Sequence, residues 1–418
     1  MARQAKKRRV ETQPNAIVGK EGIECLDSSY SRASKFERDT WNGFCELESE
    51  PALFNVMLRE FGVTGVKIQE VVSLDEEMMA FLNKPIYGLI FLFRWREDDP
   101  GKQEASCPEG LWFANQTASN ACASVALLNI VNNIEGIDLG ENLQHFKDFT
   151  MPFTPALRGD AISNFEFVKR IHNSFARKMD MLSSDYQLKA EATFKRSRPV
   201  KKNPADDRAD AGFHFIAFVP ALDRVWKFDG LERQPQALGS CVSDDDWLNL
   251  VKPAIQTRME AYEEDHIEFS ILSVARDPLP ELVDQLAANV KSLEIVQGRL
   301  SSAQEISVDL GSTLADSMHE NTILGPDESY TLTRKIIDQV TIHETQEREY
   351  QTCSVEELIQ HWQTLGRAQQ NLRAAIREEQ QSQQADEDYA EGRRYDYGPV
   401  IRTWLRFLAQ KRLIENLL

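Results

Sequence analysis

The hydrophobic pattern of the chain changes near Pro278, and this change limits the folds that the chain can adopt. Between Trp41 and Pro278, segments with strand-like and helix-like patterns alternate at the density of a globular domain. Beyond Pro278, the segments 281–296, 331–340 and 354–380 are helical by periodicity and by their content of Ala, Leu, Glu and Gln. We therefore expect an α/β or α+β domain that is followed by an all-helical extension.

The same pattern divides the chain into four parts. Residues 1–39 are polar and lack apolar periodicity, so we expect a disordered tail. The domain then covers residues 40–278, residues 279–329 form a helix and a polar linker, and residues 330–418 form the helical extension. The tail carries a basic cluster of Lys6, Lys7, Arg8 and Arg9, which resembles a short nuclear-import signal. The alternative is a solvated basic tail that no import receptor recognises.

Within the domain, apolar residues recur at the spacings of short helices and strands. We expect helices at 75–81, 120–132 and 163–178. We expect strands at 87–95, 213–219 and 225–229, of which the last two are joined by a turn at 220–224.

The chain is strongly acidic, with 48 Lys and Arg against 66 Asp and Glu and a formal net charge of -18. Phosphates repel such a chain, so we expect no direct binding to nucleic acid and a basic or neutral protein as partner. No apolar stretch approaches the roughly 20 residues of a membrane helix, so we expect a soluble intracellular protein. The six Cys are scattered and form no CxxC pair, which argues against a zinc site or a disulfide framework.

Cys122 lies at the start of the predicted helix 120–132. Asn120 is a good N-cap, and Val125 and Leu128 are available for burial. In the first turn of a helix, free N–H groups and the positive end of the helix dipole favour a thiolate, the form in which cysteine is a nucleophile. The alternative for a free Cys in a helix is a buried structural role.

Gln116 lies six residues before Cys122, in the polar stretch that leads into the helix. From there its side-chain amide can point a donor at the space in front of Cys122. Together with the backbone N–H of Cys122, this donor would bind the oxyanion of an acyl-transfer intermediate. Such a donor lowers the barrier by about 3–4 kcal/mol in comparable enzymes.

A catalytic thiolate also needs a base and a group that orients the base. His214 stands in an apolar strand, and Asp229 ends the next strand. If the hairpin turns about Leu222, His214 lies opposite Gly230 and one step from Asp229. Cross-strand Cβ atoms are about 4.5–5.5 Å apart, which suits a carboxylate that holds an imidazole. A structural histidine is the alternative. The other Cys and His residues have no ligand spacing, so we expect no metal and no cofactor.

Four motifs in this order resemble the ubiquitin carboxyl-terminal hydrolases, which are compact papain-like cysteine proteases. They are FANQTASNAC (113–122), HNSFAR (172–177), FHFIAFVP (213–220) and FDGL (228–231). The resemblance implies a central, mainly antiparallel sheet flanked by helices, with a knotted chain path. It also implies a crossover loop at 178–212, a long and polar connection that crosses over the active site. By this resemblance Cys122 is the nucleophile, His214 the base, Asp229 its orienting carboxylate and Gln116 the oxyanion donor.

Two further segments, 243–264 and 393–417, look like the larger members of that family, which carry a helical C-terminal extension. The resemblance implies a thiol-dependent deubiquitinase that acts on ubiquitin in the cytoplasm and nucleus. The implied partner is a ubiquitin receptor of the proteasome or a subunit of a chromatin-remodelling complex. The alternative is a ubiquitin-binding adaptor with an autoinhibited or idle catalytic centre. Near the end of the chain, one helical face is apolar and consists of Ile401, Trp404, Leu405 and Leu408. This face either packs within the chain or docks on the partner.

Overall fold

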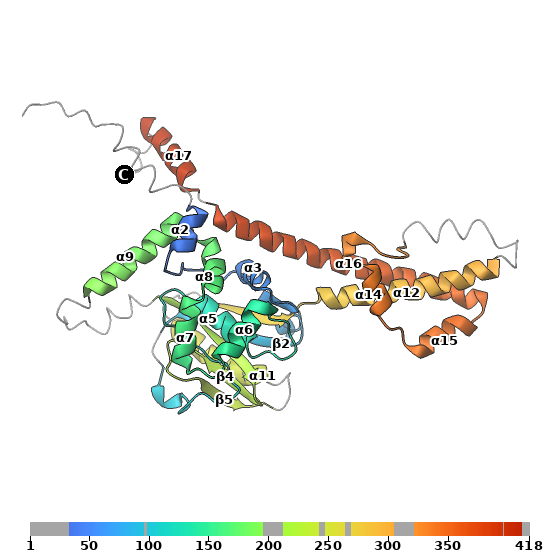
Figure 1. The fold of residues 1–418 in the computed structure, drawn as a ribbon, viewed down its shortest axis with the longest axis horizontal. Helices are drawn as coiled ribbons and strands as arrows, with labels where there is room; N and C mark the ends of the chain where they lie inside the picture. The colour runs from blue at the N-terminus through green and yellow to red at the C-terminus, as the bar shows by residue number, and fades with distance from the viewer. Residues whose placement is uncertain are drawn as a thin grey trace, which may run out of the picture.

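A six-stranded antiparallel sheet forms the centre of the computed structural model, and a helical lobe extends from one side of it (Figure 1). The described residues are 33–95, 98–194, 212–241, 247–263, 269–304, 322–395 and 397–411. In the order along the chain, the strands are β1 (Val66–Glu70), β2 (Ile86–Arg94), β3 (Phe213–Ala221), β4 (Arg224–Phe228), β5 (Gln236–Ser240) and β6 (Ser270–Arg276). Their order in the sheet is β1-β6-β2-β3-β4-β5.

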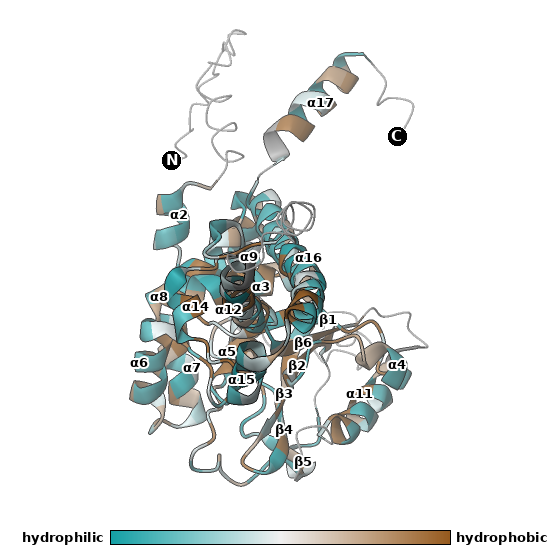
Figure 2. Ribbon diagram, turned by 90° about the vertical axis from the view of Figure 1, so that its right-hand side faces the viewer, coloured by the Kyte–Doolittle hydropathy of each residue, from teal (hydrophilic) through white to brown (hydrophobic). Residues whose placement is uncertain are grey.

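Helices cover both faces of the sheet, because the central strands are apolar on both sides. Along β3, Phe215, Ala217 and Val219 join one buried cluster, whereas Ile216 and Phe218 join the other. Figure 2 shows α11 (Trp247–Glu263) on one side of the sheet and several helices on the other. These are α5 (Cys122–Val131), α6 (Gly140–Thr150) and α7 (Pro155–Asn164), and the same apolar cluster includes residues of α3 (Pro51–Phe61) and α8 (Glu166–His172). The predicted mixed sheet-and-helix domain, with a mainly antiparallel sheet, is confirmed.

The hairpin of β3 and β4 is tighter than we predicted. Only Leu222 and Asp223 form the turn, both with positive φ (52° and 56°), as in a type I′ turn. Ala217 therefore pairs with Phe228, and the register is one residue away from the predicted one. The predicted five-residue turn at 220–224 was wrong, because Leu rarely adopts positive φ and the segment lacks the Gly that normally signals such a turn.

The extension beyond Pro278 is helical, as predicted. Two long helices, α12 (Leu279–Gln304) and α16 (Val355–Arg394), bury apolar side chains between them, with contributions from the shorter elements around them. These shorter elements are η3 (Glu328–Tyr330), α14 (Arg334–Gln339) and α15 (Glu344–Thr352). The second half of α16 lies along α3, and α17 (Gly398–Gln410) follows it (Figure 1).

Three other sequence predictions need correction. The predicted helix at 163–178 is broken: α7 ends at Asn164, α8 covers Glu166–His172, and η2 (Asn173–Phe175) follows. The segment 178–212 is not simply a loop, because Lys178–Phe194 forms α9; residues 195–211 lie outside the described residues.

The expected disordered tail 1–39 also ends in a helix, α2 (Lys35–Thr40), while residues 1–32 lie outside the described part. Ser34 and Glu37 form a capping box there, a signal that the sequence carries. The remaining short elements are α4 (Glu76–Met79), within the predicted 75–81, and η1 (Pro100–Lys102). No helix among the described residues is long and apolar enough to span a membrane.

Candidate active site

Cys122 is the first residue of α5, as its proposed role requires, but Asn120 is not the N-cap. Ala121 occupies that position, and no side chain caps the helix. Asn120 instead adopts a left-handed conformation, with φ 61°, and its Nδ2 donates to Ser184 Oγ at 3.2 Å. The first-turn N–H groups beside Cys122 are therefore not used by a side-chain cap.

His214 and Asp229 meet at the end of the β3–β4 hairpin. His214 Nε2 donates to Asp229 Oδ1 at 2.7 Å, and the two residues are only 4% and 3% exposed. The same carboxylate oxygen accepts from the N–H of Leu231 at 2.9 Å, which fixes its position. The side chain of Cys122 is close enough to the His214 ring to contribute to the rise of its pKa. The structure thus brings together the three residues that the sequence singled out, with the imidazole between the sulfur and the carboxylate.

Two buried charges stabilise each other in this arrangement. Burial of the His214 ring lowers its pKa, but hydrogen bonds to Asp229 and Cys122, together with their charges, outweigh burial and raise the pKa to about 9. For Asp229, burial raises the pKa, and the hydrogen bond and charge of His214 lower it to below its ordinary value.

Gln116 approaches this group through its backbone. Its N–H donates to the carbonyl of Gly230 at 2.8 Å, directly after Asp229. A Cβ atom at Gly230 would lie 3.0 Å from both the backbone N and the Cβ of Gln116, so the close approach needs glycine at this position. The side-chain Oε1 of Gln116 is buried and has no hydrogen-bond partner among the described residues. This oxygen is an acceptor, so only the amide Nε2 of Gln116 could donate a hydrogen bond to an oxyanion.

Apart from the HNSFAR motif, no sequence pattern indicated that His172 supports the same helix. Its Nδ1 is 2.8 Å from Ser124 Oγ, two residues after Cys122, and its Nε2 is 2.8 Å from the carbonyl of Cys45. Burial lowers the pKa of His172 to about 4, so this ring is neutral. His172 therefore has a structural role beneath the start of α5, and only its place in the HNSFAR motif hinted at one.

The other described cysteines lack such a setting. Cys45 is fully buried, and burial raises the pKa of its thiol strongly. Burial also raises the pKa of Cys107. Among the described residues, no group of three or more His, Cys, Asp or Glu side chains could hold a metal ion.

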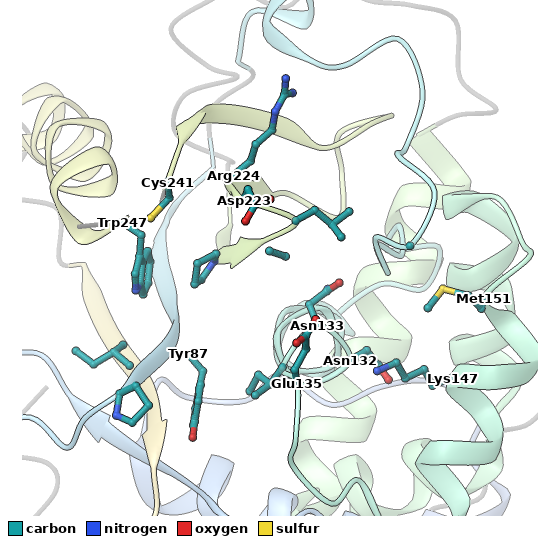
Figure 3. A pocket seen from close by; sticks show the side chains of 17 residues that line it. Tyr87, Asn132, Asn133, Glu135, Lys147, Met151, Asp223, Arg224, Cys241 and Trp247 are labelled. Carbon is teal, nitrogen blue, oxygen red and sulfur yellow. The ribbon is translucent and has the colours of Figure 1, made fainter. Parts of the chain in front are cut away.

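A cavity of about 430 Å³ lies at the opposite end of β3 from His214 (Figure 3). It is lined by the hairpin turn at Leu222 and Asp223, by the residues that follow α5 and by Trp247. Neither Cys122 nor His214 lines it, so this cavity is separate from the candidate active site.

A comparison with protein families matches residues 44–260, just over half of the chain, to "Ubiquitin carboxyl-terminal hydrolase, family 1". The chain belongs to the ubiquitin carboxyl-terminal hydrolase family. This confirms the predicted family and enzyme class, a cysteine-type ubiquitinyl hydrolase, or deubiquitinase.

Two relatives named as ubiquitin carboxyl-terminal hydrolases agree with this family assignment. The chain is 36% identical over 263 residues to ubiquitin carboxyl-terminal hydrolase isozyme L5 of Dictyostelium discoideum, which covers 62% of this chain and 71% of that protein. It is 33% identical over 278 residues to ubiquitin carboxyl-terminal hydrolase ubh-4 of Caenorhabditis elegans, covering 65% and 78%. A crystal structure of Trichinella spiralis UCH37 bound to ubiquitin vinyl methyl ester is 32% identical, covers 58% of this chain and 86% of that chain, and has a TM-score of 0.45.

The charge of His214 leads to a prediction that does not depend on catalysis. We expect its ring to titrate near pH 9 rather than at its ordinary value of 6.5. In Asp229→Asn the carboxylate charge is lost, so the pKa of His214 should fall. Titration of the ring proton by NMR measures both values. A ring that titrates at the same pH in wild type and variant would contradict the role that we assign to Asp229.

The same shift makes stability depend on pH. The pKa of the folded state lies above that of the unfolded state, so folded protein binds the extra proton. The stabilisation is fully present below pH 6.5 and is lost as the pH rises through about 9. Urea unfolding across this range should show a smaller loss in Asp229→Asn than in wild type.

Proposed function

We propose that this deubiquitinase hydrolyses the bond after the C-terminal glycine of ubiquitin through an acyl-enzyme on Cys122. The observation that carries the proposal is the hydrogen-bonded pair of His214 and Asp229 beside Cys122, the first residue of α5. This is the arrangement of nucleophile, base and orienting carboxylate that recurs in cysteine and serine proteases.

The reaction proceeds in two steps. The thiolate of Cys122 attacks the glycine carbonyl carbon, and the Cys122 N–H with the Gln116 amide stabilises the oxyanion. The intermediate collapses as the C–N bond breaks, His214 gives its proton to the departing amine, and a thioester remains. A water molecule then attacks the thioester and gives a proton to His214. The C–S bond breaks, which releases the ubiquitin carboxylic acid and restores the thiolate and the imidazolium. The acid then gives its proton to solvent and becomes a carboxylate.

The charge of the chain supports ubiquitin as the substrate. The C-terminal tail of ubiquitin carries arginines, and a chain with a net charge of -18 attracts a basic segment. We place the tail beside α9, because Asn120 joins Ser184 of that helix to the turn before Cys122.

Substitution of the three residues tests the mechanism. Cys122→Ala should lower kcat for cleavage of a ubiquitin–fluorophore conjugate by at least about 10⁴-fold, because the nucleophile is lost. His214→Ala should be nearly as damaging, and Asp229→Ala less so, because Asp229 orients the ring and does not react. Cys353→Ala, in the helical extension, is the matched control and should retain activity. Equal rates for Cys122→Ala and wild type would end the proposal, and ubiquitin binding without cleavage by wild type would favour the adaptor alternative.

Gln116 is tested separately. Gln116→Ala should lower kcat by about 10²–10³-fold and leave KM nearly unchanged, because the amide acts on the oxyanion rather than on the bound substrate. Thr117→Ala changes the exposed neighbouring side chain and is the control. A rise in KM with an unchanged kcat would show that Gln116 binds ubiquitin and does not stabilise the intermediate.

We also propose that α17 attaches the enzyme to a larger assembly. Its apolar side chains are exposed, including Ile401 (54%), Trp404 (65%) and Leu405 (46%). Figure 2 shows this helix standing away from the rest of the chain, with hydrophobic turns. An amphipathic helix with an uncovered apolar face favours a partner that covers it. The proposed partner is a ubiquitin receptor of the proteasome regulatory particle, which would place the enzyme in the cytoplasm and nucleus.

Trp404→Ala should abolish co-purification with proteasome subunits, because it removes the largest apolar side chain of this face. Cleavage of the small fluorogenic substrate should be unchanged. Gln410→Ala, on the same helix, is the control and should retain the partner. Recovery of chromatin-remodelling subunits in place of proteasome subunits would contradict the proposed assembly, and unchanged recovery with Trp404→Ala would contradict the role of the helix.

A further inference from the structure

The HNSFAR motif lies where distant parts of the chain meet the start of α9. Asn173 accepts from the N–H of Cys45 at 3.1 Å, which ties the motif to the N-terminal part of the domain. Arg177 binds both carboxylate oxygens of Asp180, in the first turn of α9, at 3.1 Å. The guanidinium of Arg394, at the end of α16, stacks over the ring of Phe175 at 4.8 Å. The motif is therefore a junction between the catalytic domain, α9 and the extension.

Arg393 makes the most direct link across this junction. Its Nη1 donates to Asp180 Oδ2 at 2.8 Å and to the carbonyl of Phe175 at 3.1 Å, and its Nε donates to Glu48 at 2.9 Å. The side chain of Arg393 is only 7% exposed. Charge-assisted hydrogen bonds that are shielded from water in this way are strong, and an unpaired partner is costly. The end of α16 is thus fixed to the first turn of α9, and Figure 1 shows these two elements close together.

The first turn of α9 is in turn linked to the residue pair before Cys122. Ser184, which is 6% exposed, donates from Oγ to the carbonyl of Asp180 at 3.0 Å. The same Oγ accepts from Asn120 Nδ2 at 3.2 Å. Asn120 has φ 61°, a left-handed conformation that asparagine adopts more readily than most residues and that the hydrogen bond to Ser184 stabilises here. Asn120 and Ala121 set the direction in which the chain enters α5, and with it the position of Cys122.

We propose that Arg393 is a positioning residue for Cys122: through Asp180 and Ser184 it holds the left-handed turn at Asn120 that places the sulfur and the N–H of Cys122. This inference rests on the proposed catalytic role of Cys122. It makes the end of the helical extension part of the working active site, although Arg393 touches neither the reacting atoms nor His214.

The loss of Arg393 should shift α9 without unfolding it. Other contacts remain to hold this helix, besides that of Arg177 with Asp180: Trp41 Nε1 donates to Asp185 at 3.0 Å, and Lys178 pairs with Glu37 at 3.2 Å. A change in rate in the Arg393 variant would then report a change in position rather than a loss of structure.

The test measures kcat and KM of the full chain with a ubiquitin–fluorophore conjugate. Arg393→Ala should lower kcat by about 2- to 30-fold, the range for residues that act through others, with KM changed by less than about twofold. Arg393→Lys keeps the charge and should restore part of kcat. Ser184→Ala should give a similar loss, and the double variant should be no slower than the slower single variant, because both act through one path.

Arg59→Ala is the matched control. Arg59 belongs to α3 and pairs with Asp386 and Glu387 of α16, at 3.6 and 3.0 Å. Its ion pairs therefore join α16 to α3 and not to α9, so kcat should not change. An unchanged kcat in Arg393→Ala, or losses that multiply in the double variant, would overturn the inference. If circular dichroism shows that Arg393→Ala does not fold, the kcat values of Arg393→Lys and Ser184→Ala test the inference instead. Unchanged kcat in both would overturn it. An inactive wild type, or an active Cys122→Ala, would instead refute the proposed function.

Discussion

The hydrogen bond between His214 and Asp229 is the contact on which the candidate site depends. Two histidines are buried among the described residues, His172 (0% exposed) and His214 (4%), but their rings differ in charge. His172 faces a hydroxyl and a carbonyl, and burial lowers its pKa to about 4. His214 faces a carboxylate at 2.7 Å and a thiol, and its pKa rises to about 9. One carboxylate at the end of β4 thus separates a structural imidazole from one that can hold and transfer a proton.

Much of this site could be predicted from the sequence, because its members stand at places with a local signal. Cys122 precedes a run of apolar residues at helical spacing, and His214 and Asp229 end two strands that are close enough in sequence to form a hairpin. The predicted strand register was wrong by one residue, but His214 and Asp229 still meet, because their side chains are long enough to form a hydrogen bond across that shift. The capping of α5 was not predicted correctly, since Asn120 is used by a tertiary contact with Ser184 instead.

The parts that could not be predicted are those fixed by contacts between distant segments. The helical pattern of α16 was clear, but nothing local showed that its last turn binds Glu48 and Asp180. Similarly, a loop was expected after residue 178, whereas Asp180 and Ser184 lie in a helix. Arg393 and Asn120 hold them from two distant segments, and Arg177, directly before the helix, binds Asp180 as well. Local propensity is a weak guide where tertiary contacts supply most of the stabilisation.

The position of β6 has a consequence for how the protein matures. This strand is the last to be synthesised, yet it lies between β1 and β2, with Val66 paired to Arg276 and Leu89 to Ser273. Before β6 emerges from the ribosome, no strand joins β1 to β2. The apolar residues of the sheet then lack the neighbours that β6 supplies. Pairings between residues so far apart in sequence are slow to form. The six-stranded sheet therefore cannot be completed until translation has passed residue 276.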